Sequence, residues 1–423
     1  MVAGLECPRP RYRGYMALPA REELSDVLSG IPGFTRLLEA VGSQPGVYLV
    51  GGAPRDLLLG RQPCDFDLVV EHDGLKVAQV IAERLGATIV IHDRFQTASI
   101  AADGFGLDVA CSRAERYPHP GDLPQVRPAS LAEDLLRRDF SVHAIAVGVS
   151  ADEVGQIIAA PGSLEDLEAR QLRVIHRGSF RDDPTRLLRL VRYAARLEFV
   201  IEPETKGLAK EAAADGALAT VSVSRIGSEM RLILAAASAI SALAIAGSCG
   251  ICEALSPGFA IDRGLCDRGI DLLPDDGRRD LMILASASLA LAPKDLVAWL
   301  DGMEFCRSDR DAVVEAVSVA QEMATRLRET ERPSQLAAVV GAHTPLTVAL
   351  AGAVGAQSQA RAWLEDLRHI TTSICGEDLL AVGVREGPDI GVALAAALSA
   401  KLDGEAQDYE SEIKVALAAV VRS

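Results

Sequence analysis

The sequence predicts an α+β protein in which an α/β head is followed by a long, all-helical region. Short β-rich runs separated by Gly or Asp occupy the stretch from Gly46 to about residue 110. From about Leu164 onward this strand signal disappears, and Ala, Leu and Arg recur with the 3.6-residue spacing of helices. A chain of 423 residues also exceeds what one hydrophobic core usually organises, so several modules are expected.

The expected elements of the head alternate along the chain. A short helix is expected over 22–41, inside an N-terminal helical extension, 1–45. Two further helices are expected near 54–60 and 75–85. They interrupt five strand-like runs, at 47–50, 66–70, 87–91, 98–101 and 105–110. These runs predict a compact head that ends near residue 150.

The helical region is divided by turn-forming residues. Breaks are expected at 256–258, 273–277, 332–334 and 386–388, where Pro and Gly gather. The longest apolar run, 232–247, is shorter than the ~20 residues that span a bilayer, so we expect one buried helix there and no membrane contact. The first residues lack the apolar segment of a signal peptide, which predicts a cytoplasmic protein.

Eight cysteines without an even framework predict reduced thiols. Cys249 and Cys252 have the spacing of metal ligands, but no second Cys pair or His pair completes a tetrahedral site. We therefore expect no zinc and read the two thiols as packing groups.

The net charge of −16 argues against a nucleic-acid partner, because phosphate neutralisation needs Lys and Arg. The balance is local, however. Residues 170–196 contain eight arginines and only two acids, Asp182 and Asp183. The charge on one face matters more than the sum, so an RNA partner is compatible with this composition.

Two carboxylates, Asp65 and Asp67, follow an apolar strand and a Gly-Gly turn. On a strand, residues i and i+2 face the same side, so the pair presents its carboxylates together. Mg²⁺ prefers a few carboxylate oxygens plus substrate phosphates and waters, and Asp108 on a later strand is the natural third acid. A lone Asp-x-Asp is usually a solvated strand end, but this context favours a divalent-metal site.

The turn at Gly51 and Gly52 lets backbone N–H groups approach a triphosphate. Pro54 begins the next helix and Arg55 can add a charge-assisted contact to phosphate. A tight strand-to-helix connection is the plainer interpretation of the same residues.

Two arginines, Arg137 and Arg138, stand beside Asp139 at the start of an apolar stretch, 142–149. Such a cluster can hold a triphosphate or can lock the head to the helices by an ion pair. The sequence favours neither interpretation over the other.

A stripe of arginines follows Asp183. At 100° per residue, Arg186, Arg189, Arg192 and Arg196 fall on one helix face, with Asp183 one turn earlier. A solvated face would mix Lys, Glu and Gln, whereas four arginines without Lys favour planar, bidentate recognition. A carboxylate accepts from an exocyclic amino group while a guanidinium donates to the adjacent ring nitrogen, so an Asp/Arg pair can select C and A over U and G.

In this order the motifs resemble those of the class II tRNA nucleotidyltransferase and bacterial poly(A) polymerase family. The resemblance extends from Tyr48 to about Glu204, with a weaker likeness in 376–391 and 402–404. It departs from the family at His143, where Asn is typical, and at Ala159 and Ala160, which replace an Asp that precedes Pro. The motifs are Gly-Gly-x-x-Arg-Asp, Asp-x-Asp, an acid at 108, Arg-Arg-Asp-Phe, Gly-Ser-Leu-Glu-Asp-Leu and Asp-Asp-x-x-Arg.

The resemblance implies a nucleotidyltransferase head (46–150), a nucleobase-recognising neck (151–212), a helical body (213–330) and an RNA-binding tail (331–423). It implies the catalytic acids Asp65, Asp67 and Asp108, of which the first two are metal ligands. The implied nucleotide-binding residues are Gly51, Gly52, Arg55, Arg138, Asp183, Arg186, Arg189 and Arg192.

The implied activity is template-independent addition of C and A to the 3′ end of tRNA, from CTP and ATP with Mg²⁺, releasing pyrophosphate. The partner is then the tRNA acceptor end, and the oligomeric state stays open. Three alternatives remain. The chain can be a poly(A) polymerase or a CC-only or A-only enzyme, a non-catalytic RNA-binding relative, or a nucleotidyltransferase acting on a small molecule or protein.

Overall fold

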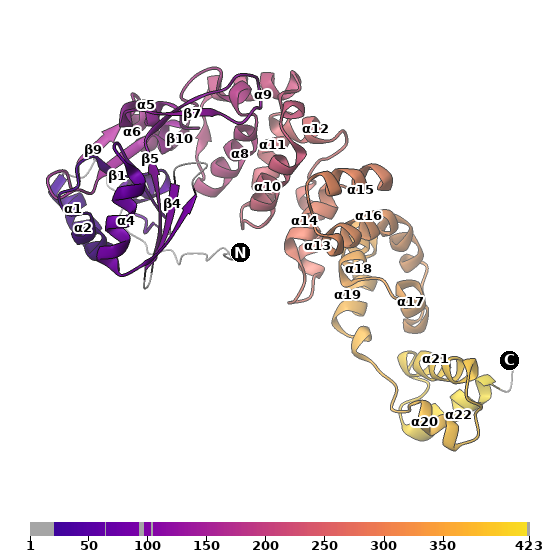
Figure 1. Ribbon diagram of the computed structural model, residues 1–423. Coiled ribbons are helices and arrows are strands. Elements are labelled where there is room, and N and C mark those ends of the chain that lie inside the picture. Colours follow the sequence, from indigo (N-terminus) through magenta and orange to yellow (C-terminus); the bar gives the residue numbers. More distant parts are fainter. Residues whose placement is uncertain (1–20, 64, 93–96, 103–104, 421–423) are drawn as a thin grey trace. The chain divides into compact units, whose positions relative to one another are not determined.

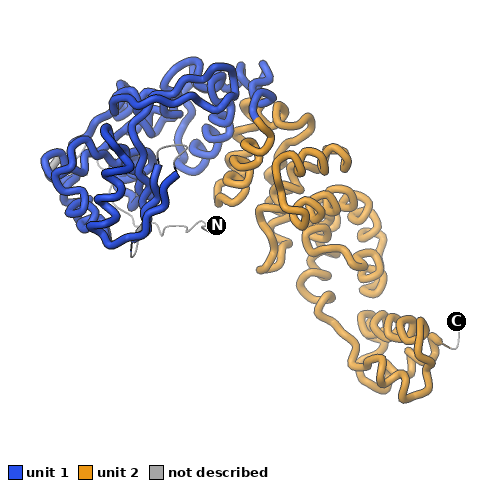
Figure 2. Tube along the Cα trace, in the orientation of Figure 1, with its two compact units in different colours: residues 1–221 blue, residues 222–423 orange. Residues whose placement is uncertain are grey.

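A computed structural model describes residues 21–63, 65–92, 97–102 and 105–420. The chain divides into two compact units, Met1–Val221 and Ser222–Ser423 (Figure 2). The predicted head and neck lie in the first unit. The finer boundaries between head, neck, body and tail stay predictions.

A seven-stranded sheet forms the centre of the first unit, in the order β3-β4-β5-β2-β1-β8-β9 (Figure 1). Neighbouring strands are antiparallel except β2 and β5, which are parallel. The strands are β1 (Val47–Val50), β2 (Phe66–Val70), β3 (Thr88–His92), β4 (Thr97–Ala102), β5 (Phe105–Cys111), β8 (Ile145–Gly148) and β9 (Ile157–Ala159). All five predicted runs are therefore strands. β8 and β9 escaped prediction because the fully buried β8 shows no alternation of apolar and polar residues.

The two faces of the sheet carry different cores. Leu49 and Leu68 face a large core with the helices α1 (Arg21–Ser29), α2 (Phe34–Val41) and α4 (Gly74–Leu85). The opposite face packs against α5 (Leu131–Leu136) through Tyr48, Val50 and Val69. Since strand residues alternate, Asp67 shares the face of Val69. The face covered by α5 is thus the one that presents the predicted catalytic acid.

The single helix predicted over 22–41 is wrong. The structure has two helices, α1 and α2, separated by Gly30–Gly33. Gly33 has a positive φ of 81°, and Pro32 lacks the N–H that a continuous helix needs.

Helices and short strands complete the first unit. The strands β10 (Gln171–Leu172) and β11 (Val200–Ile201) form a parallel pair, so strands do occur past residue 164, against the prediction. They are only two residues long, too short to leave a period in the sequence. The other elements are α3 (Gly52–Leu58), β6 (Arg113–Arg116), β7 (Gln125–Pro128), η2 (Ser141–His143), α6 (Ser163–Glu168), α7 (Ser179–Asp182), α8 (Thr185–Leu197), α9 (Pro203–Ala214) and η3 (Ala217–Thr220).

The described part of the second unit is built from helices. They are α10 (Val223–Leu234), α11 (Ala239–Ser248), α12 (Ile251–Leu255), α13 (Arg263–Leu272), α14 (Arg279–Ala287), α15 (Pro293–Gly302), α16 (Arg307–Arg328), α17 (Pro333–Val340), α18 (Pro345–Ala351), η4 (Gly352–Ala356), α19 (Gln357–Glu365), η5 (Leu367–His369), α20 (Gly376–Ala381), α21 (Pro388–Leu402) and α22 (Tyr409–Val420). The predicted breaks at 256–258, 273–277, 332–334 and 386–388 coincide with helix boundaries.

One helix prediction in this unit is wrong. The apolar run 232–247 is divided between α10 and α11, which end and begin on either side of 235–238. Among the described helices none is alone long and apolar enough to cross a membrane. One bent pair, Pro333–Val340 with Pro345–His369, meets the criterion by length and composition only.

Cys249 and Cys252 are buried free thiols in this unit. Burial raises the pKa of Cys252 to about 12, and the neighbouring Cys249 adds to the increase. A metal ligand needs the thiolate, which this environment disfavours. The pair fits the interpretation as packing groups.

Two glycines in helices of this unit provide a matched test of packing. A Cβ on Gly227 of α10 would lie 2.1 Å from the backbone oxygen of Met303, whereas one on Gly247 of α11 would meet nothing within 4 Å. We expect Gly227→Ala to lower the free energy of unfolding by about 2–3 kcal/mol through overpacking. Gly247→Ala should raise it by about 0.5–1 kcal/mol, because Ala restricts the unfolded chain and favours helix.

Denaturant titration followed by tryptophan fluorescence measures both variants, since Trp299 and Trp363 both lie in the second unit. Equal stabilities for the two variants would contradict the close approach of α10 to Met303.

Candidate active site

The centre of the candidate site is the parallel pair of strands β2 and β5. Their register places Asp67 directly opposite Asp108, and both side chains are exposed. Phe66 and Leu107 precede the two acids, and Leu68 and Val109 follow them. All four are buried in the same core and hold this register. The sheet therefore brings together two acids that are far apart in sequence.

Asp65 lies just before β2, which begins at Phe66. Its side chain is exposed, and its charge acts on Asp67. Across the described residues, no three His, Cys, Asp or Glu side chains form a ready-made metal cluster. The structure thus pairs Asp67 with Asp108 and leaves Asp65 beside the pair.

The Gly-Gly turn lies against this pair. Gly51 has a positive φ of 76°, and a Cβ on it would lie 3.2 Å from Asp67 Oδ2 and 3.7 Å from Arg138 Nη1. A larger residue would be strained in this conformation and would crowd the carboxylate. Gly51 therefore lets the turn, Asp67 and Arg138 meet at one point.

The electrostatics of this point favour a cation. Desolvation raises the pKa of Asp67, and the charge of Asp108 raises it further, while Arg138 opposes both. The donor set consists of carboxylate oxygens, which suit Mg²⁺, an ion usually held by one or two carboxylates plus phosphates and waters. The residues present fit the predicted magnesium site.

The guanidinium of Arg138 has one nitrogen bonded to a carboxylate and another that is buried without a hydrogen bond to any described residue. Its Nη2 donates to Asp134 Oδ2 at 2.8 Å, and Asp134 is fully buried. Its Nε is buried without a hydrogen-bond partner among the described residues. A buried N–H without a partner is costly, so an anion at this point would satisfy it.

Arg55 has a different environment. It is 2% exposed, and its Nε and Nη2 donate to Asp56, which follows it in α3. Its Nη1 lies 2.6 Å from His143 Nε2. A Cβ on Gly52 would lie 3.3 Å from Arg55 Nη2. Arg55 thus lies under the turn, held by two side chains of the protein.

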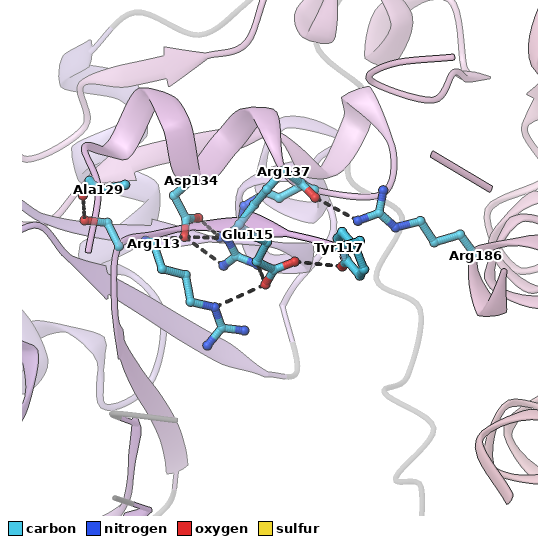
Figure 3. A network of polar contacts seen from close by, with 9 residues as sticks. Arg113, Glu115, Tyr117, Ala129, Asp134, Arg137 and Arg186 are labelled. Atoms are coloured by element: carbon cyan, nitrogen blue, oxygen red, sulfur yellow. Dashed lines mark hydrogen bonds and ion pairs between the residues drawn. The ribbon is translucent and has the colours of Figure 1, made fainter. Parts of the chain in front are cut away.

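Arg137 organises a polar network beside the site (Figure 3). Its Nη1 donates to Glu115 Oε1 at 2.6 Å, and its Nε and Nη2 donate to Asp134 Oδ1. Tyr117 donates to the other oxygen of Glu115 at 2.9 Å. The carbonyl of Arg137 accepts from Arg186 Nη2 at 2.9 Å. The network fixes Arg186, a predicted base-reading residue, to the segment that carries Arg138.

The helix α8 carries the predicted arginine stripe. Arg186 and Arg192 are buried, the Arg189 side chain is 32% exposed, and Arg196 is exposed. Arg186 Nη1 also donates to Ser179 Oγ at 2.7 Å. Asp183 Oδ1 accepts from the N–H and hydroxyl of Thr185, which fixes the start of the helix.

The sequence left open whether the cluster of Arg137, Arg138 and Asp139 holds a triphosphate or forms an ion pair with the helices. Asp139 forms such an ion pair. Its Oδ2 accepts from Arg189 Nε at 2.9 Å and Nη2 at 2.7 Å, an ion pair between the head and α8. Arg138 meanwhile points to Gly51. The cluster therefore divides its roles: Asp139 locks α8 in place, and Arg138 faces the turn.

Sequence reasoning missed Tyr193 and the role of His143 in this region. The Tyr193 ring lies 4.3 Å from that of His143, and the Arg192 guanidinium lies 4.6 Å from the Tyr193 ring centre. A lone Tyr inside an arginine-rich helix leaves no distinctive signal in the sequence.

Known proteins resemble both a part of this chain and most of its length. A family model described as the poly A polymerase head domain matches residues 47–173. The A-adding tRNA nucleotidyltransferase of Geobacter sulfurreducens is 32% identical over 88% of this chain, which covers 45% of that protein. The CC-adding tRNA nucleotidyltransferase of Deinococcus radiodurans is 30% identical over 89% of this chain and 90% of its own length.

Several solved structures have a similar fold over most of the length of this chain. The Thermotoga maritima CCA-adding enzyme complexed with tRNA-CCA has a TM-score of 0.79 and 26% identity, covering 93% of this chain and 98% of that one. A CCA-adding enzyme in complex with CTP has a TM-score of 0.81 and 25% identity, covering 95% and 98%.

The sheet and the paired acids define a nucleotidyltransferase-type head in the first unit, and the second unit is helical in its described part. The chain belongs to the class II tRNA nucleotidyltransferase and poly(A) polymerase family. It covers less than half the length of the A-adding relatives from Geobacter sulfurreducens and Aquifex aeolicus, 45% and 23%.

Proposed function

We propose that this protein adds nucleotides to the 3′ end of tRNA without a template, from CTP and ATP, and releases pyrophosphate. The observation that carries the proposal is the pairing of Asp67 with Asp108 against the turn at Gly51. The Deinococcus relative of matching length and the tRNA, ATP and CTP complexes of similar structures support the substrates. A cytoplasmic location accords with these substrates.

The chain's own residues position the reactants. Asp67 and Asp108, with Asp65 beside them, would hold Mg²⁺, which neutralises charge on the phosphates and favours in-line attack of the 3′-hydroxyl on the α-phosphate. The Arg138 Nε would donate to the triphosphate, and the turn at Gly51 and Gly52 gives its backbone close access.

Base selection is proposed for Asp183 and Arg186, supported by Arg189 and Arg192 on the same helix. Arg186 is held at Ser179 Oγ and at the Arg137 carbonyl, so its guanidinium plane is fixed before a base arrives. A fixed donor next to a carboxylate suits the amino and ring-nitrogen edge of C and A. The helical second unit would contact the tRNA through shape and backbone.

A second candidate is a specialist that adds only CC or only A. The names of the relatives favour it, since A-adding and CC-adding enzymes both align with 88–89% of the chain. A poly(A) polymerase is a further candidate with the same chemistry, because the family model that matches the head is described as that of a poly A polymerase. The exposed paired acids argue against a non-catalytic RNA-binding relative, and the base-reading pair against a small-molecule or protein substrate.

One assay distinguishes these functions. Purified protein and Mg²⁺ are incubated with tRNA transcripts that end before CCA, after C and after CC, each with CTP, ATP or both. We expect stepwise addition that stops at CCA. Addition of CC only, of A only or of an unlimited A ladder would identify a specialist, and no extension of any transcript would refute the proposal.

Arg186→Ala should relax base selection. The variant loses the fixed donor, and we expect addition of C and A to fall about 10- to 100-fold, with a smaller preference over UTP and GTP, because one good base contact gives about 1–3 kcal/mol of discrimination. Single-nucleotide incorporation rates with the four triphosphates measure it. Arg196→Ala, an exposed change on the same helix, is the control. An unchanged preference in Arg186→Ala would remove Arg186 from base selection.

A further inference from the structure

A continuous line of hydrogen bonds joins the turn of the head to the arginine helix. Arg55 Nη1 lies 2.6 Å from His143 Nε2, and His143 Nδ1 lies 2.8 Å from Asp139 Oδ1. The other oxygen of Asp139 accepts from Arg189. Asp139 Oδ1 also accepts from the Phe140 N–H at 2.9 Å, so both carboxylate oxygens are occupied. His143 is the link between an arginine of α3 and a carboxylate paired with α8.

The partners of His143 determine its protonation. A guanidinium only donates and an ionised carboxylate only accepts, so the ring must accept at Nε2 and donate at Nδ1. Burial alone would raise the pKa of Asp139, but hydrogen bonds and charges from His143 and Arg189 hold it well below its usual range. Burial lowers the pKa of His143, with Arg55 and Arg189 in the same direction and Asp139 opposing. The ring is therefore neutral and in a single tautomer.

Three of the four residues in this line are sealed from solvent. Arg55, His143 and Asp139 are 2%, 5% and 7% exposed. The Tyr193 ring covers the imidazole edge-on at 4.3 Å and lies 5.5 Å from the Arg189 guanidinium carbon. A substrate does not reach His143, so the residue can act on a reaction only through the groups that it holds.

Given the proposed function, we propose that His143 is a positioning residue for nucleotide binding, which sets Arg55 under the Gly-Gly turn relative to Arg189 on the base-selecting helix. The Gly-Gly turn, which approaches the phosphates, and α8, which carries the base-selecting residues, would then be held at a separation fixed by one imidazole. Hydrogen bonds that orient metal ligands contribute about 10- to 100-fold to affinity or activity, and we expect an effect of similar size for an oriented arginine.

Two variants separate positioning from packing. His143→Gln supplies one acceptor and one donor without charge, whereas His143→Leu fills similar volume without either. We expect Leu to weaken ATP binding about 10- to 100-fold and Gln to restore most of it. His343→Leu is the matched control, since His343 also bonds an acid, Glu315, but lies in the second unit. It should bind ATP as the wild type does.

The pH dependence gives a readout that packing would not change. The charged groups facing His143 are Arg55 from α3, Arg189 from α8 and Asp139 from its own segment, with Tyr193 over the ring. Protonation of Nε2 would direct an N–H at the Arg55 guanidinium. Because the pKa of His143 is lowered, wild-type ATP affinity should fall at a pH below the ordinary range of histidine, and it should fall more steeply than that of the Gln variant, which keeps only the pH dependence of ATP and the other residues.

The experiment measures ATP binding by equilibrium dialysis with Mg²⁺, together with tRNA extension, for the wild type and the three variants. Circular dichroism confirms folding. If the wild type binds ATP but extends no transcript, the proposed function is refuted. The comparison of ATP binding among the variants then still tests the positioning role of His143. Leu binding as tightly as wild type, or a folded Gln variant binding as weakly as Leu, would overturn the positioning role, as would the absence of ATP binding by the wild type.

Discussion

Asp67→Asn should abolish nucleotide addition, reducing it by about 10³-fold or more. The change removes a charge from the pair with Asp108 that would hold Mg²⁺, and loss of strong electrostatic stabilisation of the transition state costs about 3–4 kcal/mol or more. The fold should be retained, because the side chain is exposed and Asn keeps its size. Single-turnover extension of a tRNA transcript at saturating CTP and ATP measures the loss.

Asp73→Asn is the matched control for this change. Asp73 is exposed, follows the same strand β2 and has a positive φ of 43°, which Asn tolerates. Its addition rate should equal that of the wild type. Asp65→Ala should also lose activity while keeping affinity for tRNA. Activity of Asp67→Asn within tenfold of the wild type would rule out the β2–β5 pair as the catalytic centre.

Asp139→Ala should destabilise the first unit by about 3 kcal/mol. Asp139 is 7% exposed, and its removal takes away the acceptor that it supplies to Arg189, His143 and the Phe140 N–H. Breaking a buried ion pair by deleting one partner costs about 3–5 kcal/mol, and we take the low end because the Arg189 side chain is 32% exposed. Hydrogen exchange of the α8 amides measures the effect in this unit alone.

Asp122→Ala serves as the control for this prediction. It removes an exposed carboxylate from the same unit, and surface changes of this kind usually stay within about 0.5 kcal/mol. Asp139→Asn should fall between the two, because its amide oxygen still accepts one hydrogen bond. Equal protection of α8 in Asp139→Ala and Asp122→Ala would show that the ion pair does not hold the helix.

The parts of the fold that the sequence predicts are those with a local period. The alternation around Asp67 and Asp108 identifies their strands, and the arginine spacing identifies α8 as one helix. The strand β8 and the break between α1 and α2 depend on burial and on a four-residue turn, which propensity over a long window averages out.

The site is predictable in its residue types more than in its contacts. The sequence predicts a metal site at Asp65 and Asp67 with Asp108 as the third acid, and the register of two parallel strands places Asp67 opposite Asp108. The sequence predicts that Arg55 contacts phosphate, whereas in the structure its guanidinium is hydrogen-bonded to Asp56 and His143. Such partners are far apart in sequence, and no periodicity connects them. The site assignments therefore stay predictions until the variants are measured.

The register of β2 with β5 has a consequence for the evolution of length in this head. Insertions between residues 71 and 104 leave the two acids opposite each other, because five consecutive residue pairs hold the strands independently of the connection. One residue inserted between Leu107 and Asp108 would instead turn the second acid to the opposite side of the sheet, where the large core lies. Natural homologues should therefore vary in length at the connections between the elements that separate β2 from β5, and should keep constant spacing inside both strands.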